Sequence, residues 1–184
     1  MFLDKLKEVP KNLYLIIMFV GGFILFLAIN TLVFQAFSVY SLFATHGILD
    51  FEFAWTVEQI ELIFIVWGST GMVIQESGVY WDFFYIIGYV SFAFGGILLV
   101  TRKVSGNFQK IGLYVSFIAI LSGLFDVIEN IFLLIMLQNP GTIPTFAPPI
   151  ATIMATMKFS CLAIALLYFV IGLIIALILI IKRK

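Results

Sequence analysis

The chain has 184 residues, of which 63% are hydrophobic and 11% are charged, and its mean hydropathy is +1.18. A soluble globular domain is about half apolar and about a quarter charged, so this composition excludes a water-soluble fold. Ten basic and ten acidic residues cancel, and nothing indicates a nucleic-acid partner. A single cysteine and a single histidine exclude an internal disulfide, a cysteine metal cage and a two-histidine haem. We therefore expect neither a metal site nor a cofactor.

Four apolar stretches are long enough to cross a bilayer as helices, which takes about 20 residues. The predicted spans are residues 13–37, 81–101, 111–137 and 149–181. Residues 62–74 are also apolar, but this stretch of about a dozen residues suits an interfacial, re-entrant or packed helix better than a span. The sequence therefore predicts an all-α integral membrane protein built as a four-helix bundle.

The basic residues predict how the chain is oriented in the membrane. Apart from Lys158, every lysine and arginine lies in residues 1–12, 102–110 or 182–184. Because cytoplasmic segments carry an excess of Lys and Arg, these three segments are predicted to be cytoplasmic. Residues 38–80 and 138–148 contain no lysine or arginine and are predicted to lie outside. We expect a multi-pass protein of the cell membrane with both termini in the cytoplasm.

Residues 38–80 are too numerous for a simple turn and are predicted to form a small helical cap between the first and second spans. Thr56-Val57-Glu58-Gln59 has the capping-box pattern that begins a helix. That helix would place on one apolar face Val57, Ile60, Phe64 and Trp67. The pattern is then expected to break at Gly68, Gly71 and Gly78, which leaves room for a second short element before Trp81. The cap has two interpretations, a structural cover on the lipid headgroups or a lid over a site.

Ionisable residues inside spans are rare, and they usually face the protein interior and pair with one another. Asp126, Glu129 and Asn130 share a helix face by their i, i+3 and i+4 spacing, and Asp82, Tyr85 and Tyr89 form a second stripe by the same rule. The predicted spans place both stripes and Lys158 at similar depths near the outer leaflet. The candidate ligand-binding residues are Asp82, Tyr85, Tyr89, Asp126, Glu129, Asn130 and Lys158.

Three functions are compatible with this polar layer. Because several carboxylates face one lysine, we favour binding or transport of a cation, an amine or a polar lipid headgroup. An integral membrane enzyme acting on a lipid or isoprenoid-like substrate is the first alternative, with Asp126, Glu129 and Lys158 as candidate catalytic residues. A structural or assembly subunit, in which polar contacts only fix helix register, is the second. The expected partners are membrane lipids and a small cationic or lipid ligand, and a homo-oligomer is left open.

The chain contains five short motifs: Leu49-Asp50-Phe51, Thr56-Val57-Glu58, Asp82-x-x-Tyr85-x-x-x-Tyr89, Phe125-Asp126-x-x-Glu129-Asn130 and Lys158-Phe159. In these motifs it resembles small four-span prokaryotic membrane proteins to which no activity is assigned. The motifs cover most of the chain after the first span. The resemblance implies a common four-helix architecture, and it implies no activity.

Overall fold

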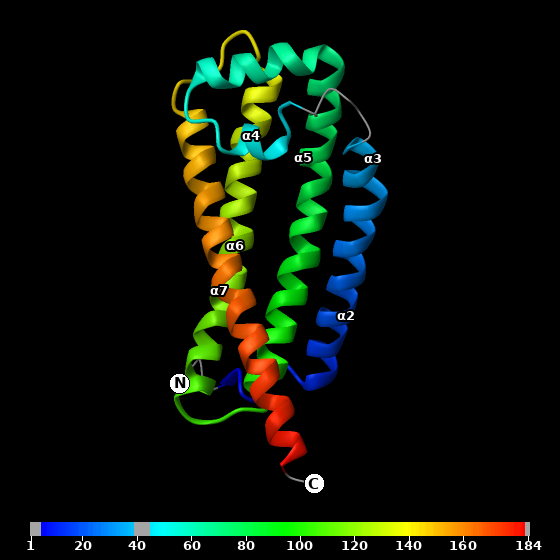
Figure 1. Ribbon diagram of the computed structural model, residues 1–184, viewed down its shortest axis with the longest axis vertical. Coiled ribbons are helices and arrows are strands. Elements are labelled where there is room, and N and C mark those ends of the chain that lie inside the picture. Colours follow the sequence, from blue (N-terminus) through cyan, green and yellow to red (C-terminus); the bar gives the residue numbers. More distant parts are fainter. Residues whose placement is uncertain (1–4, 39–44, 183–184) are drawn as a thin grey trace. The chain divides into compact units, whose positions relative to one another are not determined.

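The computed structural model describes residues 5–38 and 45–182, and every regular element in these ranges is a helix. The elements are α2 (Asn12–Ile29), the π-helix η1 (Asn30–Phe34), α3 (Gln35–Ser38), α4 (Ile48–Glu52), α5 (Val57–Thr101), α6 (Gly106–Gln138) and α7 (Ala147–Ile181) (Figure 1). Four helices are long and apolar enough to cross a membrane, and a short helix lies between the first and second of them along the chain. The predicted fold class is confirmed, and the orientation in the membrane stays a prediction.

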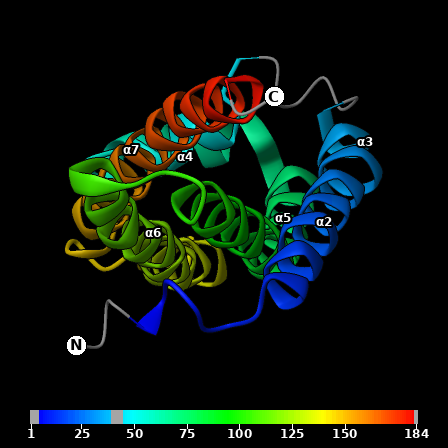
Figure 2. The same ribbon diagram turned by 90° about the horizontal axis from the view of Figure 1, so that it is seen from below.

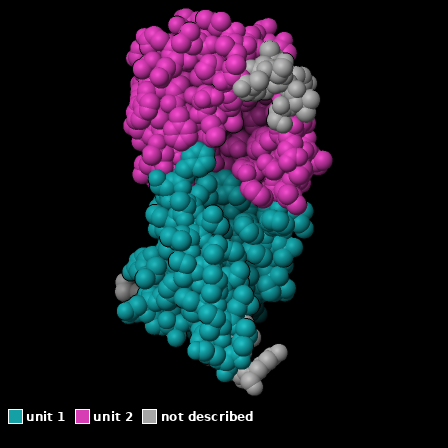
Figure 3. Space-filling model, viewed as in Figure 1, with its two compact units in different colours: residues 1–25, 87–123, 159–184 teal, residues 26–86, 124–158 magenta. Residues whose placement is uncertain are grey.

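The chain divides into two compact units (Figure 3). Unit 1 comprises residues 1–25, 87–123 and 159–184, and unit 2 comprises residues 26–86 and 124–158. Both units contain a segment from each of the four candidate spans. Each unit has its own buried apolar core.

In unit 1, α2 and α5 are in close backbone contact, and Figure 2 shows the two helices side by side. A Cβ atom on Gly22 would lie 2.5 Å from the backbone nitrogen of Phe92, and one on Gly95 would lie 2.8 Å from the carbonyl oxygen of Leu15. Small residues let helix backbones approach one another in this way. The neighbouring core of the unit contains Leu15, Leu98 and Leu113.

Polar contacts at the end of α5 also belong to unit 1. The Arg102 guanidinium donates through Nη2 to the carbonyl oxygen of Leu6 at 2.7 Å and through Nη1 to Oδ1 of Asn12 at 2.6 Å. One arginine thus joins the segment before α2 to the end of α5. The helix that follows begins at Gly106, so the connection between α5 and α6 is shorter than the predicted loop 102–110.

In unit 2, the predicted capping box forms at the start of α5. The amide of Gln59 donates to Oγ1 of Thr56 at 3.4 Å, and the amide of Thr56 donates to Oε1 of Gln59 at 3.3 Å. On the expected apolar face, Ile60, Phe64 and Trp67 are each at most 6% exposed, and Val57 is half-buried. This part of the sequence-based prediction is confirmed.

The same helix face packs on residues from other elements of unit 2. Phe51 of α4 lies edge-on against Trp67, with ring centroids 5.3 Å apart. The shared core also includes Leu133 and Met136 of α6 and Ala151 of α7. The predicted cap therefore shares its apolar core with two of the long helices.

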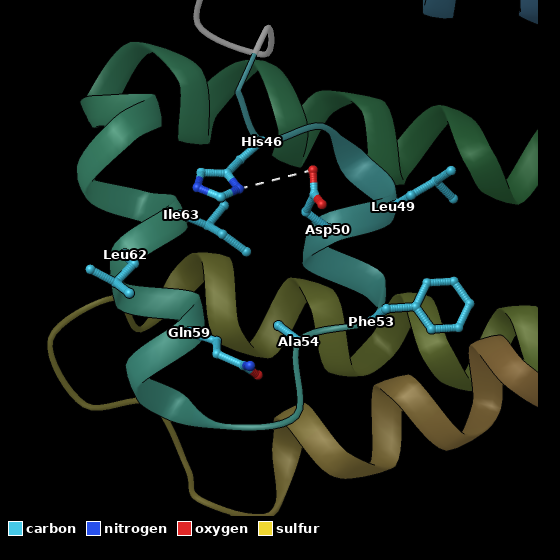
Figure 4. A pocket seen from close by; sticks show the side chains of 8 residues that line it. All are labelled: His46, Leu49, Asp50, Phe53, Ala54, Gln59, Leu62 and Ile63. Carbon is cyan, nitrogen blue, oxygen red and sulfur yellow. Dashed lines mark ion pairs between the residues drawn. The ribbon is translucent and has the colours of Figure 1, made fainter.

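Gly68 bends α5, with φ +60° and ψ −175° inside an otherwise helical run. Residues 57–67 run across the direction of the part of α5 that follows (Figures 1 and 4). The expected interruption at Gly68 is present, but the expectation for the other two glycines is wrong, because Gly71 and Gly78 lie within the helix. Residues 69–80, which we assigned to the cap, therefore continue the same helix as the second predicted span.

Replacing Gly68 by alanine is expected to lower the free energy of unfolding by about 1–3 kcal/mol, because this backbone region is nearly restricted to glycine. No neighbouring atom would obstruct the added methyl group, so the backbone conformation alone accounts for the effect. Gly141→Ala is the matched control, since that glycine has no positive φ and equally open space. Thermal unfolding of the detergent-solubilised variants measures both values, and equal losses would contradict the interpretation.

Candidate functional site

Unit 2 brings four charged side chains together, and we call them the Lys158 cluster: Lys158 of α7, Glu52 of α4, and Asp126 and Glu129 of α6. The side-chain nitrogen Nζ of Lys158 lies 2.8 Å from Oε2 of Glu129, 3.0 Å from Oδ1 of Asp126 and 3.4 Å from Oε2 of Glu52. All four residues are buried, with exposed fractions of 0–8%. Three carboxylates from two elements thus surround one ammonium group.

Helical spacing places the α6 and α7 members of the cluster. Asp126 and Glu129 are one turn apart and therefore lie on the same face of α6. On α7, small buried residues precede Lys158 on its own face at intervals of four and three residues. They are Ala147, Ala151 and Ala155, each at most 1% exposed. Small side chains allow a close approach of the neighbouring elements, so Lys158 meets the carboxylates without extending into solvent.

Glu52 enters the cluster because α4 is held against α7. The amide of Gly47 donates to Oδ2 of Asp50 at 2.7 Å and so begins the short helix. Oγ1 of the fully buried Thr152 lies within hydrogen-bonding distance of two carbonyl oxygens at the end of α4, 3.0 Å from that of Glu52 and 2.9 Å from that of Ala54. These contacts anchor the backbone from which the Glu52 side chain reaches Lys158.

A second polar pair lies in the same unit. Nδ2 of Asn130 donates to Oδ2 of Asp82 at 2.7 Å and so joins α6 to α5. Asn130 is buried and Asp82 is half-buried. The Asp82 charge is close enough to Asp126 for the two carboxylates to influence each other. Asp82 is thus a fourth acidic group beside the cluster.

The two tyrosines of the predicted stripe, Tyr85 and Tyr89, belong to different compact units. The Tyr85 ring packs against Phe26, with centroids 4.9 Å apart, and against Phe34, with centroids 5.2 Å apart. Tyr89 is buried but belongs to unit 1, whereas every member of the Lys158 cluster belongs to unit 2. Of the seven candidate residues, Asp82, Asp126, Glu129, Asn130 and Lys158 form the polar contacts just described.

Two of the carboxylates are incompletely bonded. Oε1 of Glu129 is buried and has no hydrogen-bond partner among the residues that the structure describes. Oε2 of Glu129 and Oε2 of Glu52 are buried and face the Lys158 nitrogen, at 2.8 Å and 3.4 Å. Burial raises the pKa of the Glu52 carboxyl, and the nearby Lys158 charge opposes this shift without cancelling it. Lys158 therefore attracts these two groups by charge, and it donates a hydrogen bond to Oδ1 of Asp126.

Sequence reasoning missed Glu52. The available signal was that residues 38–80 hold several acids and no lysine or arginine, so an acid of this segment that becomes buried can form an ion pair with Lys or Arg only from elsewhere in the chain. Local spacing does not indicate which one. Asp50, two residues earlier, lies in an open pocket of about 450 Å³ with His46 and Gln59, and its Oδ2 is 4.0 Å from Nδ1 of His46 (Figure 4).

No group of three or more His, Cys, Asp or Glu side chains in residues 5–38 and 45–182 is arranged to hold a metal ion. Comparison with known proteins finds no matching family model, no matching curated protein and no matching solved structure. The function must therefore be argued from the cluster itself.

Proposed function

We propose that the Lys158 cluster binds a cationic group, and that the chemistry it fits best is a primary ammonium, carried by a small amine or by a polar lipid headgroup. The observation that carries this proposal is the position of three carboxylates within 3.4 Å of Lys158 Nζ. A single ammonium needs only one such counterion. The excess of acidic groups leaves binding capacity for a second positive charge.

The charge balance supports a second cation or bound protons. If all three carboxylates were ionised, the buried cluster would be negative even with Lys158 charged, and Asp82 would add to the imbalance. Isolated charges are strongly disfavoured in a medium of low dielectric constant. A ligand cation or added protons would offset this charge.

An ammonium group suits the geometry for a specific reason. Lys158 itself shows how these carboxylates receive an ammonium, with nitrogen–oxygen distances of 2.8–3.4 Å. A primary ammonium has three hydrogen-bond donors, and the buried carboxylate oxygens of Glu129 and Glu52 are acceptors, among them Oε1 of Glu129, which has no partner among the described residues. A quaternary ammonium has no donor, and we expect the site to discriminate against it.

The test is titration calorimetry of the protein in nanodiscs, with ethylammonium chloride as the probe. Tetramethylammonium chloride is the comparison, because this cation has the same charge and no hydrogen-bond donor. We expect ethylammonium to bind and tetramethylammonium not to bind. Asp126→Asn and Glu129→Gln should each weaken ethylammonium binding about 10- to 100-fold, because each removes a charged acceptor worth about 1.5–3 kcal/mol. Glu61→Gln is the control, because this acid of α5 is exposed.

A second arm separates free amines from lipid headgroups. Nanodiscs containing phosphatidylethanolamine should reduce ethylammonium binding by competition if the headgroup occupies the site, and phosphatidylcholine nanodiscs should not. Unchanged ethylammonium affinity in both cluster variants, or equal affinity for the two ammonium probes, would contradict the proposal.

One observation favours a structural role as a second candidate. Lys158 joins α4, α6 and α7, and Thr152 adds two contacts between α7 and the end of α4. If this connection is the whole function, neutral replacements at the cluster will lower stability and no cationic probe will bind. The calorimetric comparison therefore also distinguishes the two candidates.

A further inference from the structure

We infer that Glu52 and Glu129 share one proton, and that this proton fastens α4 to the Lys158 cluster, so that its loss releases α4 and exposes Lys158 to water. The inference rests on the site of the proposed function and assigns it a regulation. It starts from the buried carboxylate oxygens of Glu129 and Glu52.

The Glu129 side chain is fully buried, and its Oε1 has no hydrogen-bond donor among the described residues. Oε2 of Glu129 and Oε2 of Glu52 are also buried and face the single nitrogen of Lys158. A buried acceptor without a donor destabilises the folded state, because its bonds to water are lost and not replaced. Protonating one of the two carboxyls supplies the missing donor, because a protonated carboxyl donates one hydrogen bond and the other carboxylate accepts it.

The two carboxyls face the same ammonium group. Oε2 of Glu129 and Oε2 of Glu52 lie 2.8 Å and 3.4 Å from the same nitrogen of Lys158. Glu129 also influences the ionisation of Glu52 directly. When the shared proton leaves for bulk water, two like charges remain side by side in a buried place.

The groups that face Glu52 come from three helices. They are Lys158 of α7, Asp126 and Glu129 of α6, and the more distant Asp82 of α5. Burial raises the pKa of Glu52, and the charge of Lys158 lowers it by less. A carboxyl with a raised pKa in the folded state stabilises that state at low pH, and this contribution is lost as the pH rises from the unfolded value through the folded one. Docking of α4 should therefore weaken as the pH rises.

Hydrogen–deuterium exchange of α4 tests the inference. The amide of Phe53 donates to the carbonyl oxygen of Leu49 at 3.0 Å, so its protection reports whether α4 is formed and docked. After correction for intrinsic exchange, the opening constant of the wild-type protein should rise about tenfold per pH unit between the ordinary pKa of a glutamate and the raised pKa of Glu52 in the folded protein, and it should level off above that range.

Glu52→Gln should remove this pH dependence, because the glutamine amide donates to Glu129 at every pH. Glu129→Gln should also remove the pH dependence, because in this variant the glutamine amide donates to Glu52. This second variant keeps the test decisive if Glu52→Gln fails to fold. Glu61→Gln should follow the wild type. A flat wild-type profile, or the wild-type slope in both cluster variants, would overturn the shared proton.

The exchange measurement and the calorimetry test the shared proton and the proposed ligand separately. If ethylammonium does not bind but α4 shows the expected pH profile, the proposed ligand is wrong and the shared proton stands. If ethylammonium binds but the profile is the same in all variants, the site stands without this regulation.

Discussion

Replacing Lys158 by methionine is expected to lower the free energy of unfolding by about 3–5 kcal/mol, the effect of leaving buried charged groups without their partner. Methionine is a flexible apolar side chain of similar length, so the lost charge should dominate over a packing defect. Glu52, Asp126 and Glu129 would then share a buried site without a cation. Unfolding in mixed detergent micelles, followed by circular dichroism, measures the loss.

Two further variants separate charge from packing. Lys110→Met is the control, because Lys110 is exposed and its replacement should change stability little. In the double variant Lys158→Met/Glu129→Gln, one of the carboxylates left without a partner is neutral, so this protein should be more stable than Lys158→Met alone. If the double variant is the less stable of the two, the carboxylates are not the source of the loss.

Replacing Gly22 by alanine is expected to destabilise the protein by about 1–3 kcal/mol through overpacking between α2 and α5. The added Cβ would lie 2.5 Å from the Phe92 nitrogen and 2.6 Å from the Gly88 carbonyl oxygen. Both are backbone atoms, so a side-chain rotation cannot relieve the contact and the helices must separate. Thermal unfolding in detergent, with retained helix content checked by circular dichroism, gives the magnitude.

Gly21 provides a control on the same helix, one residue earlier. A Cβ at Gly21 meets nothing within 4 Å, and alanine is the better helix former, so Gly21→Ala should be neutral or slightly stabilising. Similar destabilisation by both substitutions would indicate a general sensitivity of α2. It would contradict a specific contact at Gly22.

Much of the fold follows from local features of the sequence. Long apolar stretches must be helical because lipid offers the backbone no hydrogen-bond partner. The capping box at Thr56 and Gln59 depends on residues three positions apart, so sequence alone predicts it. The shared face of Asp126 and Glu129 likewise follows from helical spacing.

Where the structure differs from the sequence-based prediction, contacts between distant parts of the chain are the main cause. Glu52 joins the cluster because Thr152, 100 residues later, holds the end of α4, and no local spacing contains that information. Gly71 and Gly78 stay helical because the cost of a glycine, about 1 kcal/mol, is small where burial and packing favour a continuous helix.

The shared core of α4, the start of α5 and the long helices has a consequence for the segment between the first two spans. Phe51, Ile60 and Trp67 are buried partly against Leu133 and Met136, which follow far later in the sequence. A peptide of residues 45–67, excised from the protein, would leave these large side chains in water and should remain unstructured. An antibody raised against such a peptide would then select unfolded conformations and bind the intact protein poorly.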